Sequence, residues 1–318
     1  MISKEKLNFK NFIKGHSEKD IAKLMSTKSM NYKSRGISFF ERKYDVEEYA
    51  GFSMLSKLVY YENKLVAHCA GFPMKAKIKG EIYKTASIGD LIVDSSCRGL
   101  GVASYMIKGI MDLAKTEKLP FIYTVPNKVS NDIFIKLGWK LKSKNTLYSI
   151  KIRTIPFLKI FNRLGLTNYY YFLFYSFNRK KNINRNKFNL KNSLIVEGFD
   201  GIIRDSSYYN YKTYGNNFLY EFKNGKIWFK IDDGLVIGDI YVNENSDINA
   251  LMKEFTKFSK NSGIHQIKLF TTHQGKLHTY FEKNHHTKDS GLNLLVYSFD
   301  NKLNLDNWYT NSADYNTF

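Results

Sequence analysis

A glycine-containing loop offers the clearest chemistry in this sequence. Residues 88–103 read IGDLIVDSSCRGLGVA, where an apolar run ending at Val93 precedes a polar loop, and a helical pattern starts at Val102. Glycine lets a backbone turn tightly and approach a ligand. The N-terminus of a helix presents unsatisfied N–H groups and the positive end of its dipole. The order strand, glycine loop, helix therefore predicts a site for a diphosphate.

Two common diphosphate motifs are absent. The dinucleotide fingerprint G-x-G-x-x-G would need glycine where Ser104 stands, and no G-x-x-x-x-G-K-[ST] occurs. The pattern that does fit is R-x-x-G-x-A, formed by Arg98, Gly101 and Ala103. It resembles the pyrophosphate-binding signature of the GNAT N-acetyltransferases, which use acetyl-CoA and no metal.

That resemblance implies which residues meet acetyl-CoA. The pantetheine arm would lie along the backbone of Leu91, Ile92 and Val93. The diphosphate would meet the amides of the loop and first helical turn: Arg98, Gly99, Leu100, Gly101, Val102, Ala103 and Ser104. Arg98 would either add charge or order the loop. The alternative interpretation makes 98–103 a helix-capping turn.

Two positions further along the chain bear on the same expected site. Asn127 follows a strand, where the family commonly has a polar residue near the cofactor arm, but it could equally cap the next helix. The family often has a tyrosine, the general acid for the departing thiolate, four residues before the glycine of an LG-aromatic ending. Here that residue is Phe134, which cannot donate a proton. The acid's role is vacant or filled from elsewhere.

Transfer to an amine needs a deprotonated nitrogen, so a base should lie within hydrogen-bond reach of it. Asp90, on the strand leading to the cofactor, is the first candidate, and Tyr123 on the next strand is the second. The alternative for Asp90 is a solvated or salt-bridged strand residue. Cys97 could suggest an acyl-enzyme, but a loop thiol is usually incidental. The histidines of the second half (His273, His278, His285 and His286) lack zinc spacing, so no metal is expected.

The elements around the loop follow a recognisable order. Residues 1–50 look mainly helical, and strand-like runs follow at 53–61, 64–72 and 82–93, the first two joined by a tight turn at Glu62-Asn63. An amphipathic helix from Val102 leads to a strand at 121–125, a helix at 128–137 ending before Gly138, and a strand to about 152. This order resembles the GNAT fold over residues 38–150. The segment PNKVSNDIFIKLGW is also similar to GNAT proteins encoded with bacterial surface-polysaccharide genes.

The second half repeats part of this plan. Residues 237–243, IGDIYVN, match 88–94 at an offset of 149 residues. An amphipathic helix, a strand at 264–271, another helix and a final strand at 291–299 follow, but R-x-x-G-x-A is missing. A supersecondary plan repeated at long offset argues for duplicated domains, the second without its cofactor loop.

Composition limits the class of protein. The chain has 318 residues, a net charge of +20 and two cysteines, and neither a signal peptide nor a membrane-spanning run is evident. We therefore expect a cytoplasmic protein, peripheral at the inner membrane face if it contacts lipid. The charge fits either an AT-rich genome or an anionic partner. Residues 151–192 hold ten Lys or Arg, no acid and many aromatics. They predict a helical interdomain linker or, alternatively, a contact with anionic membrane or a lipid-linked sugar, whereas nucleic acid is disfavoured.

These patterns predict an α/β protein with two tandem GNAT-like domains and mixed, centrally splayed sheets, the second domain degenerate. The expected boundaries are 1–150 for the acetyl-CoA domain, 151–192 for the linker and 193–318 for the second domain. The predicted function is N-acetylation of a primary amine, with an amino sugar of surface-polysaccharide synthesis as the favoured acceptor. The alternative is a non-catalytic protein that binds CoA or a membrane.

Overall fold

The computed structural model describes residues 4–28, 36–179, 191–212, 217–272, 274–284, 287–289 and 291–315. The chain forms two compact units. Unit 1 comprises Met1–Ser143 and Leu292–Asp306, and unit 2 comprises Lys144–Gly291 and Asn307–Phe318. Each has a mixed sheet with helices, as an α/β protein should.

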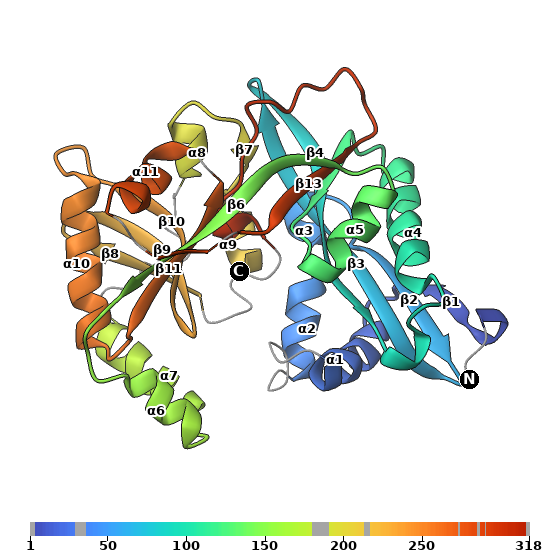
Figure 1. Ribbon diagram of the computed structural model, residues 1–318, viewed down its shortest axis with the longest axis horizontal. Coiled ribbons are helices and arrows are strands. Elements are labelled where there is room, and N and C mark those ends of the chain that lie inside the picture. The colour runs from blue at the N-terminus through green and yellow to red at the C-terminus, as the bar shows by residue number, and fades with distance from the viewer. Residues whose placement is uncertain are drawn as a thin grey trace. The chain divides into compact units, whose positions relative to one another are not determined.

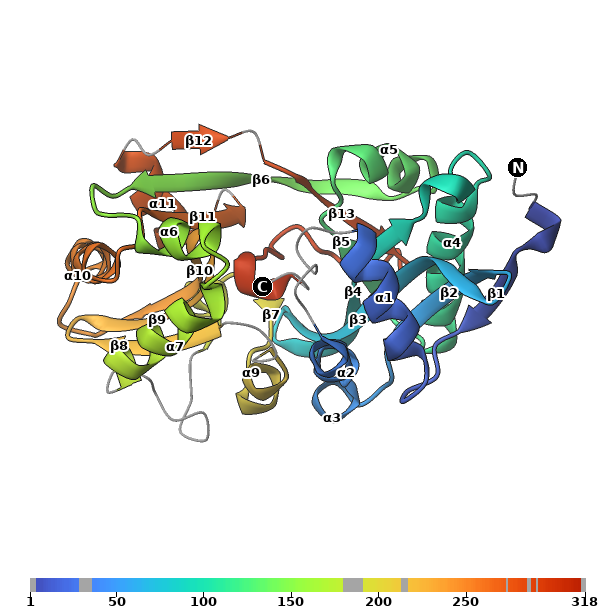
Figure 2. The ribbon, with the colours of Figure 1, turned by 90° about the horizontal axis from the view of Figure 1, so that it is seen from below.

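The sheet of unit 1 runs in the order β1-β2-β3-β4-β5-β13 (Figure 1). Its strands are β1 (Asn8–Asn11), β2 (Leu55–Tyr61), β3 (Lys64–Ile78), β4 (Glu81–Val93), β5 (Phe121–Thr124) and β13 (Asn293–Ser298). Its helices are α1 (Ser17–Lys28), α2 (Ile37–Tyr44), α3 (Glu47–Ala50), α4 (Val102–Thr116) and α5 (Lys128–Lys136). Helices α1–α3 lie on one face of the sheet and α4 and α5 on the other (Figure 2). Both faces of the central strand β3 are accordingly buried over most of its length.

Several predicted elements of unit 1 are confirmed. Glu62 and Asn63 form the turn between β2 and β3, and both have positive φ (48° and 62°), as a two-residue hairpin turn of the type I′ class requires. Helix α5 ends where expected, with Gly138 at a φ of 87° just beyond its end. Helix α4 buries the apolar face that its sequence periodicity predicts.

Strands β4 and β5 run in parallel and then separate. They pair only from Ala86 to Ile88, and the Thr124 hydroxyl donates a 3.0 Å hydrogen bond to the Ile88 carbonyl at the last paired position. Beyond that point β4 continues to Val93, paired with β3 on its other side. Within the described part of the chain, no strand pairs with residues 89–93 on the β5 side. The backbone edge of β4 is therefore open where the cofactor arm was expected.

Unit 2 has the sheet order β6-β11-β10-β9-β8, with β12 beside β6 (Figures 1 and 2). The strands of this sheet are β6 (Lys140–Lys151), which crosses the unit boundary, β8 (Asn217–Phe222), β9 (Gly225–Asp232), β10 (Gly234–Val242), β11 (Gln266–Thr272) and β12 (Thr287–Asp289). The short strand β7 (Gly201–Ile202) also belongs to unit 2. The helices of unit 2 are α6 (Phe157–Arg163), α7 (Thr167–Asn178), α8 (Ser193–Val196), α9 (Ser206–Lys212), α10 (Ile248–Asn261) and α11 (Gly275–Lys283). Side chains from β8–β11 and from α6, α7, α10 and α11 make one hydrophobic core.

The sequence repeat corresponds to a structural one. Strands β10 and β11 are parallel and pair only from Leu235 to Ile237. Ile237 is the last residue of β10 that pairs with β11, as Ile88 is the last of β4 that pairs with β5. Each is followed by Gly-Asp at an irregularity in the antiparallel ladder on the other side. The two units therefore share one strand–helix–strand plan in matching register.

The partners of two segments differ from those expected. The strand predicted at 291–299 exists as β13, but it pairs antiparallel with β5 in unit 1 and not with the second half. Conversely, residues 145–151 of β6 pair with β11 in unit 2. Hydrophobic alternation predicts that a strand exists but not which edge it joins. Within the basic 151–192 stretch, α6 and α7 bury Leu158, Tyr170 and Phe174 in the core of unit 2, and residues 180–190 lie outside the described part.

No described helix is long and apolar enough to cross a membrane.

Candidate active site

The glycine loop presents a row of backbone donors. Gly101 is the N-cap of α4, at a φ of 73°, and offers no side-chain cap. Gly99 is also left-handed, at a φ of 80°, which favours glycine. Within the described residues, the N–H groups from Gly99 to Ser104 donate to no acceptor of the protein, whereas those of Arg98 and Tyr105 bond to Ser95 and Gly101. Open donors at a helix N-terminus suit a diphosphate.

Asp94 supports the chain just before the glycine loop, and Arg98 adds an exposed positive charge to the loop. The Asp94 carboxylate caps the short turn before the loop by accepting from the Ser96 N–H at 3.0 Å. Arg98 is exposed and makes no ion pair with any described residue. Its guanidinium is therefore available to an anion at the rim. Cys97 is fully buried, which does not suit a nucleophile.

The β4 irregularity places Asp90 in an unusual conformation. Asp90 has a φ of 47°, uncommon for a non-glycine residue, at the point where β4 falls out of register with β3. Its carboxylate is almost completely buried and accepts from the Lys43 ammonium at 2.7 and 2.9 Å and from the Tyr44 hydroxyl at 2.9 Å. Two donor groups from α2, making three hydrogen bonds, thus hold Asp90 at the start of the open edge.

These contacts decide the charge of Asp90. Burial alone would raise the pKa of its carboxyl, but the Lys43 ammonium, assisted by the Tyr44 hydroxyl, holds it below its usual value. Burial lowers the pKa of Lys43, and the Asp90 carboxylate opposes that effect. The ammonium also lies 5.1 Å from the centre of the Phe72 ring. Asp90 is therefore ionised and ion-paired, which matches the alternative weighed for it. Its role as base stays a prediction.

A buried histidine extends this network. His68 on β3 is fully buried, and its Nε2 lies 3.0 Å from the Ser56 hydroxyl. Burial lowers the pKa of His68 to about 4, because the charged imidazolium would be desolvated beside Lys43. A neutral imidazole therefore lies next to the Lys43–Asp90 pair at neutral pH.

The other predicted residues have clear structural contacts. Asn127 is exposed and caps α5, accepting from the Ser130 N–H at 2.9 Å, which is the helix-cap alternative. Phe134 is buried, with its ring edge-on to Trp139 at 4.9 Å. Tyr123 is buried within β5. The backbone of Leu91, Ile92 and Val93 forms the open edge of β4, so the structure gathers the loop and this edge at one end of the sheet, while Asn127, Phe134 and Tyr123 keep their functional roles as predictions.

No group of histidine, cysteine and acidic residues in the described chain could hold a metal ion. His278 lies 3.0 Å from the Tyr148 hydroxyl. His273, His285 and His286 lie outside the described residues.

Sequence reasoning missed Lys43 and Tyr44. They come from the run FFERKYDVEEY, which reads as an ordinary amphipathic helix end. A lysine on the apolar stripe of a helix, beside phenylalanines, was the available signal, because an unpaired buried ammonium would be costly.

Comparison with known proteins fits this geometry. Residues 18–141 match the family model of the GNAT acetyltransferase domain. Unit 1 carries a GNAT acetyltransferase domain. It contains the open loop and the separating strands β4 and β5 described above.

The fold of the chain also resembles solved structures. One is a conserved Enterococcus faecalis protein of unknown function, described as a probable N-acyltransferase, with a TM-score of 0.62 and 15% identity over 95% of this chain and 75% of that one. GCN5-related N-acetyltransferases from Anabaena variabilis (TM-score 0.54, 15% identity, 91% and 72% covered) and Kribbella flavida (0.53, 12%, 94% and 73%) are also similar. No curated protein matches the sequence.

Proposed function

We propose that the protein transfers an acetyl group from acetyl-CoA to a primary amine. The observation that carries this proposal is the row of open N–H groups from Gly99 to Ser104 beside the unpaired β4 edge at 89–93. The donors fit a diphosphate, and the edge fits an extended amide-containing arm that bonds as an added strand does. Bound there, acetyl-CoA would supply an activated thioester carbonyl.

The residues of unit 1 have separate tasks in this proposal. The loop amides and Arg98 bind the diphosphate. The N–H and carbonyl groups of Leu91, Ile92 and Val93 align the arm. Asp90, at the start of the open edge, either accepts a proton from the amine through water or fixes the strand conformation by its ion pair with Lys43. Phe134 donates no proton, so the departing thiolate takes one from another donor or from water.

The proposed acceptor is an amino sugar carried on a nucleotide or lipid, in surface-polysaccharide synthesis. A net charge of +20 supports an acceptor with an anionic carrier. A lipid carrier would bring the protein to an anionic membrane surface. The resemblance of residues 126–139 to proteins of polysaccharide gene clusters supports the same choice.

The alternative is a protein that binds CoA without turnover, and Phe134 is the observation that favours it. Incubating the protein with acetyl-CoA and a panel of amino sugars, polyamines and peptides, with thiol release as the readout, tests both. Thiol released only with one acceptor class supports the enzyme. CoA binding in calorimetry without thiol release supports the alternative. Failure to bind CoA contradicts both.

A further inference from the structure

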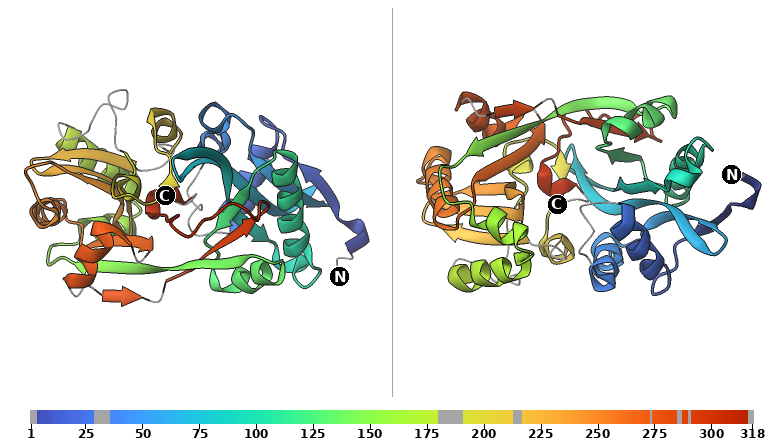
Figure 3. Two further views of the ribbon diagram at one scale, coloured as in Figure 1. Left: turned by 90° about the horizontal axis from the view of Figure 1, so that it is seen from above. Right: turned by 60° about the horizontal axis from the view of Figure 1, so that its bottom comes forward.

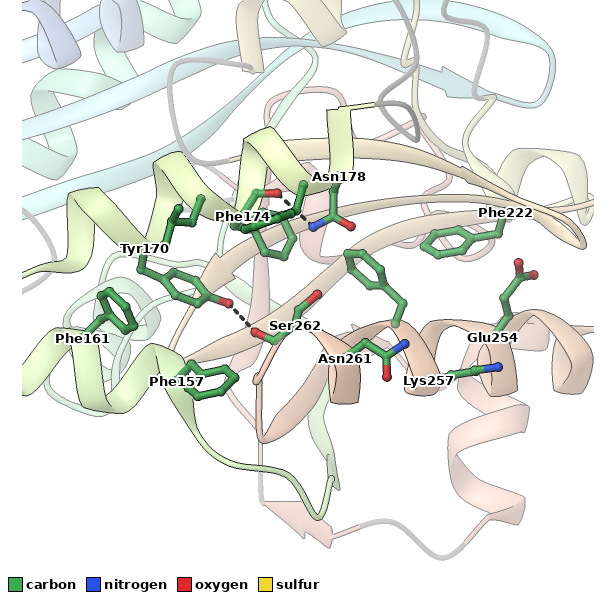
Figure 4. A pocket seen from close by; sticks show the side chains of 13 residues that line it. Phe157, Phe161, Tyr170, Phe174, Asn178, Phe222, Glu254, Lys257, Asn261 and Ser262 are labelled. Atoms are coloured by element: carbon green, nitrogen blue, oxygen red, sulfur yellow. Dashed lines mark hydrogen bonds between the residues drawn. The ribbon is translucent and has the colours of Figure 1, made fainter.

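Unit 2 contains a large cavity that the acetyltransferase site does not use. Its volume is about 820 Å³, within the roughly 300–1,000 Å³ typical of ligand pockets. The wall comes from α6, α7, α10 and β8 (Figure 4). Most of it is aromatic: Phe157, Phe161, Tyr170, Phe174, Phe222 and Phe258.

Two polar side chains of the wall, Tyr170 and Asn178, bond within the protein. The Tyr170 hydroxyl donates to the Ser262 carbonyl at 3.0 Å, and the Asn178 amide donates to the Phe174 carbonyl at 2.9 Å. These bonds, dashed in Figure 4, turn polar atoms toward the wall itself. The interior therefore offers mainly apolar contact, which selects for hydrocarbon over a polar ligand.

The cavity differs between its two ends. Phe157 and Phe161 lie at one end in Figure 4, and Glu254 and Lys257 lie at the other. Glu254 accepts from the backbone N–H groups of Lys223 and Asn224 at 3.0 and 3.3 Å, so its carboxylate oxygens are held at the turn between β8 and β9. Lys257 is exposed and makes no ion pair with any described residue. The end with Lys257 can therefore receive an anionic group.

The surroundings share this combination of charge and apolar surface. Phe177, which lines the cavity, is 83% exposed. Lys159, Arg163 and Arg179 on or next to α6 and α7 are exposed and make no ion pair within the described chain. An exposed aromatic rim with unneutralised cations suits an approaching amphiphile with a negative head.

We propose that this cavity binds a long-chain carboxylate, with the hydrocarbon along the aromatic wall and the carboxylate at Lys257. A compact aromatic ligand would leave the length of the wall uncovered. A cationic amphiphile would place like charge beside Lys257. The proposal concerns unit 2 alone and is independent of acetyl transfer by unit 1.

Calorimetric titration of the full chain with octanoate, decanoate and dodecanoate tests the apolar part. Each methylene buried should tighten binding by about fourfold, so dodecanoate should bind far more tightly than octanoate. Dodecyltrimethylammonium, with the same tail and opposite charge, should bind at least tenfold more weakly than dodecanoate. Affinity independent of chain length, or equal for both charges, would overturn the proposal.

Matched variants locate the site. Leu173→Glu places a negative charge in the cavity wall and should weaken dodecanoate binding at least tenfold. The control, Phe172→Glu, places the same charge on the exposed part of the same helix and should change the dodecanoate affinity less than threefold. Lys257→Gln should weaken dodecanoate but not dodecanol, and Lys253→Gln, one turn earlier on α10, should affect neither.

A bilayer surface is the competing occupant. Co-sedimentation with vesicles of phosphatidylcholine and one-third phosphatidylglycerol distinguishes a membrane contact from a cavity that binds a single carboxylate. If the protein sediments with these vesicles while monomeric dodecanoate fails to bind, the site is a membrane contact and the proposal is wrong. If dodecanoate binds, and competes with any sedimentation, the cavity is the site.

Discussion

In each unit two parallel strands pair briefly and then separate, and we call this arrangement a fork. The two forks share one geometry but differ in what occupies the space between the separated strands. In unit 1, β4 and β5 separate after Ile88, and the β4 edge beyond is open within the described chain. In unit 2, β10 and β11 separate after Ile237, and the C-terminal segment lies there. Thr271 of β11 forms an isolated bridge with Asn311, and the Ser312 hydroxyl bonds to both the N–H and the carbonyl of Phe270. The chain's own backbone thus takes the position that an added strand would occupy.

The aspartate that follows each fork has different partners in the two units. Asp90 and its equivalent, Asp239, are both buried and ion-paired, but by different groups. Asp239 pairs with Arg204, which also contacts Asp314 of the C-terminal segment at 2.8 Å. The segment that closes the second fork, drawn in dark red in Figure 3, is therefore tied to the strand by a three-residue charge network.

The helix after each fork completes the comparison. Helix α4 begins at an uncapped glycine with open N–H groups. The N-cap of helix α10 is Asp247, whose carboxylate accepts from the Ala250 N–H at 2.6 Å. A carboxylate at a helix N-terminus satisfies the donors and dipole that a phosphate would otherwise meet. On both counts we expect unit 1, and not unit 2, to bind CoA.

The largest effect should come from opening the unit 2 network. Arg204→Met leaves Asp239 and Asp314 buried without a countercharge, which should cost about 3–5 kcal/mol of the free energy of unfolding. The control is Lys268→Met, which removes a partly exposed ion pair with Asp233 and should cost less than about 1 kcal/mol. Urea unfolding followed by hydrogen exchange in β10 and β11 measures both. Equal losses in the two variants would mean that the network does not hold the segment.

The second prediction is that acid lowers the stability of unit 1, where His68 lies beside the Lys43–Asp90 pair, more than that of unit 2. Burial holds the folded pKa of His68 at about 4, below the unfolded value of about 6.5. Between these values the unfolded chain binds a proton that the folded chain does not, so the stability of unit 1 should fall as pH decreases from 6.5 to 4, by about 3 kcal/mol in total.

The corresponding network in unit 2 relies on Arg204, which stays charged throughout this range. Hydrogen exchange at pH 7.5 and 4.5 should therefore show β3 losing protection more than β10. His68→Gln should remove most of the difference. A wild-type β3 that is as protected at pH 4.5 as at 7.5 would show that His68 is protonated without cost.

The sequence was informative wherever a signal was local. The glycine loop, the α4 periodicity, the Glu62-Asn63 turn and the Ile-Gly-Asp repeat all depend on neighbours in the chain, and each predicted an element that the structure contains. Other features depend on contacts between residues 40 to 177 positions apart in the chain. They are the partners of β13, the closing of the second fork by residues 310–315 and the pairing of Asp90 with Lys43. Burial patterns indicate that a residue is inside but do not identify its partner.

The third prediction tests the open loop directly. Gly101→Glu puts a carboxylate where the diphosphate should bind and should weaken CoA binding about a hundredfold, the loss expected for two charge-assisted hydrogen bonds. Gly80→Glu is the matched control, because Gly80 has a similar left-handed conformation (φ 90°) and open space around it, but lies in the β3–β4 turn. Calorimetry with CoA measures both. Residual full-strength binding in Gly101→Glu would place CoA elsewhere, unit 2 included.

The smallest effect concerns turnover at Asp90. A carboxylate whose pKa is held low by Lys43 accepts protons weakly, so Asp90→Asn should lower kcat by about tenfold, below the usual range for a general base. The Kd for CoA should stay within twofold. Because the change leaves Lys43 without its countercharge, the assay is made at low temperature with β3 protection as a check of folding. Activity within threefold of wild type would make Asp90 a positioning residue.

Tyr44→Phe decides between these roles without removing the charge. The Tyr44 hydroxyl donates to Asp90 at 2.9 Å and lowers the pKa of its carboxyl, so its loss should raise that pKa. If Asp90 is the base, it must be ionised to act, and the acid limb of the kcat profile should move to higher pH. If Asp90 only fixes the strand, the limb should stay in place while kcat changes by less than threefold. The ion pair with Lys43 remains in this variant, so a shifted limb reports proton transfer at Asp90 and not a collapsed strand.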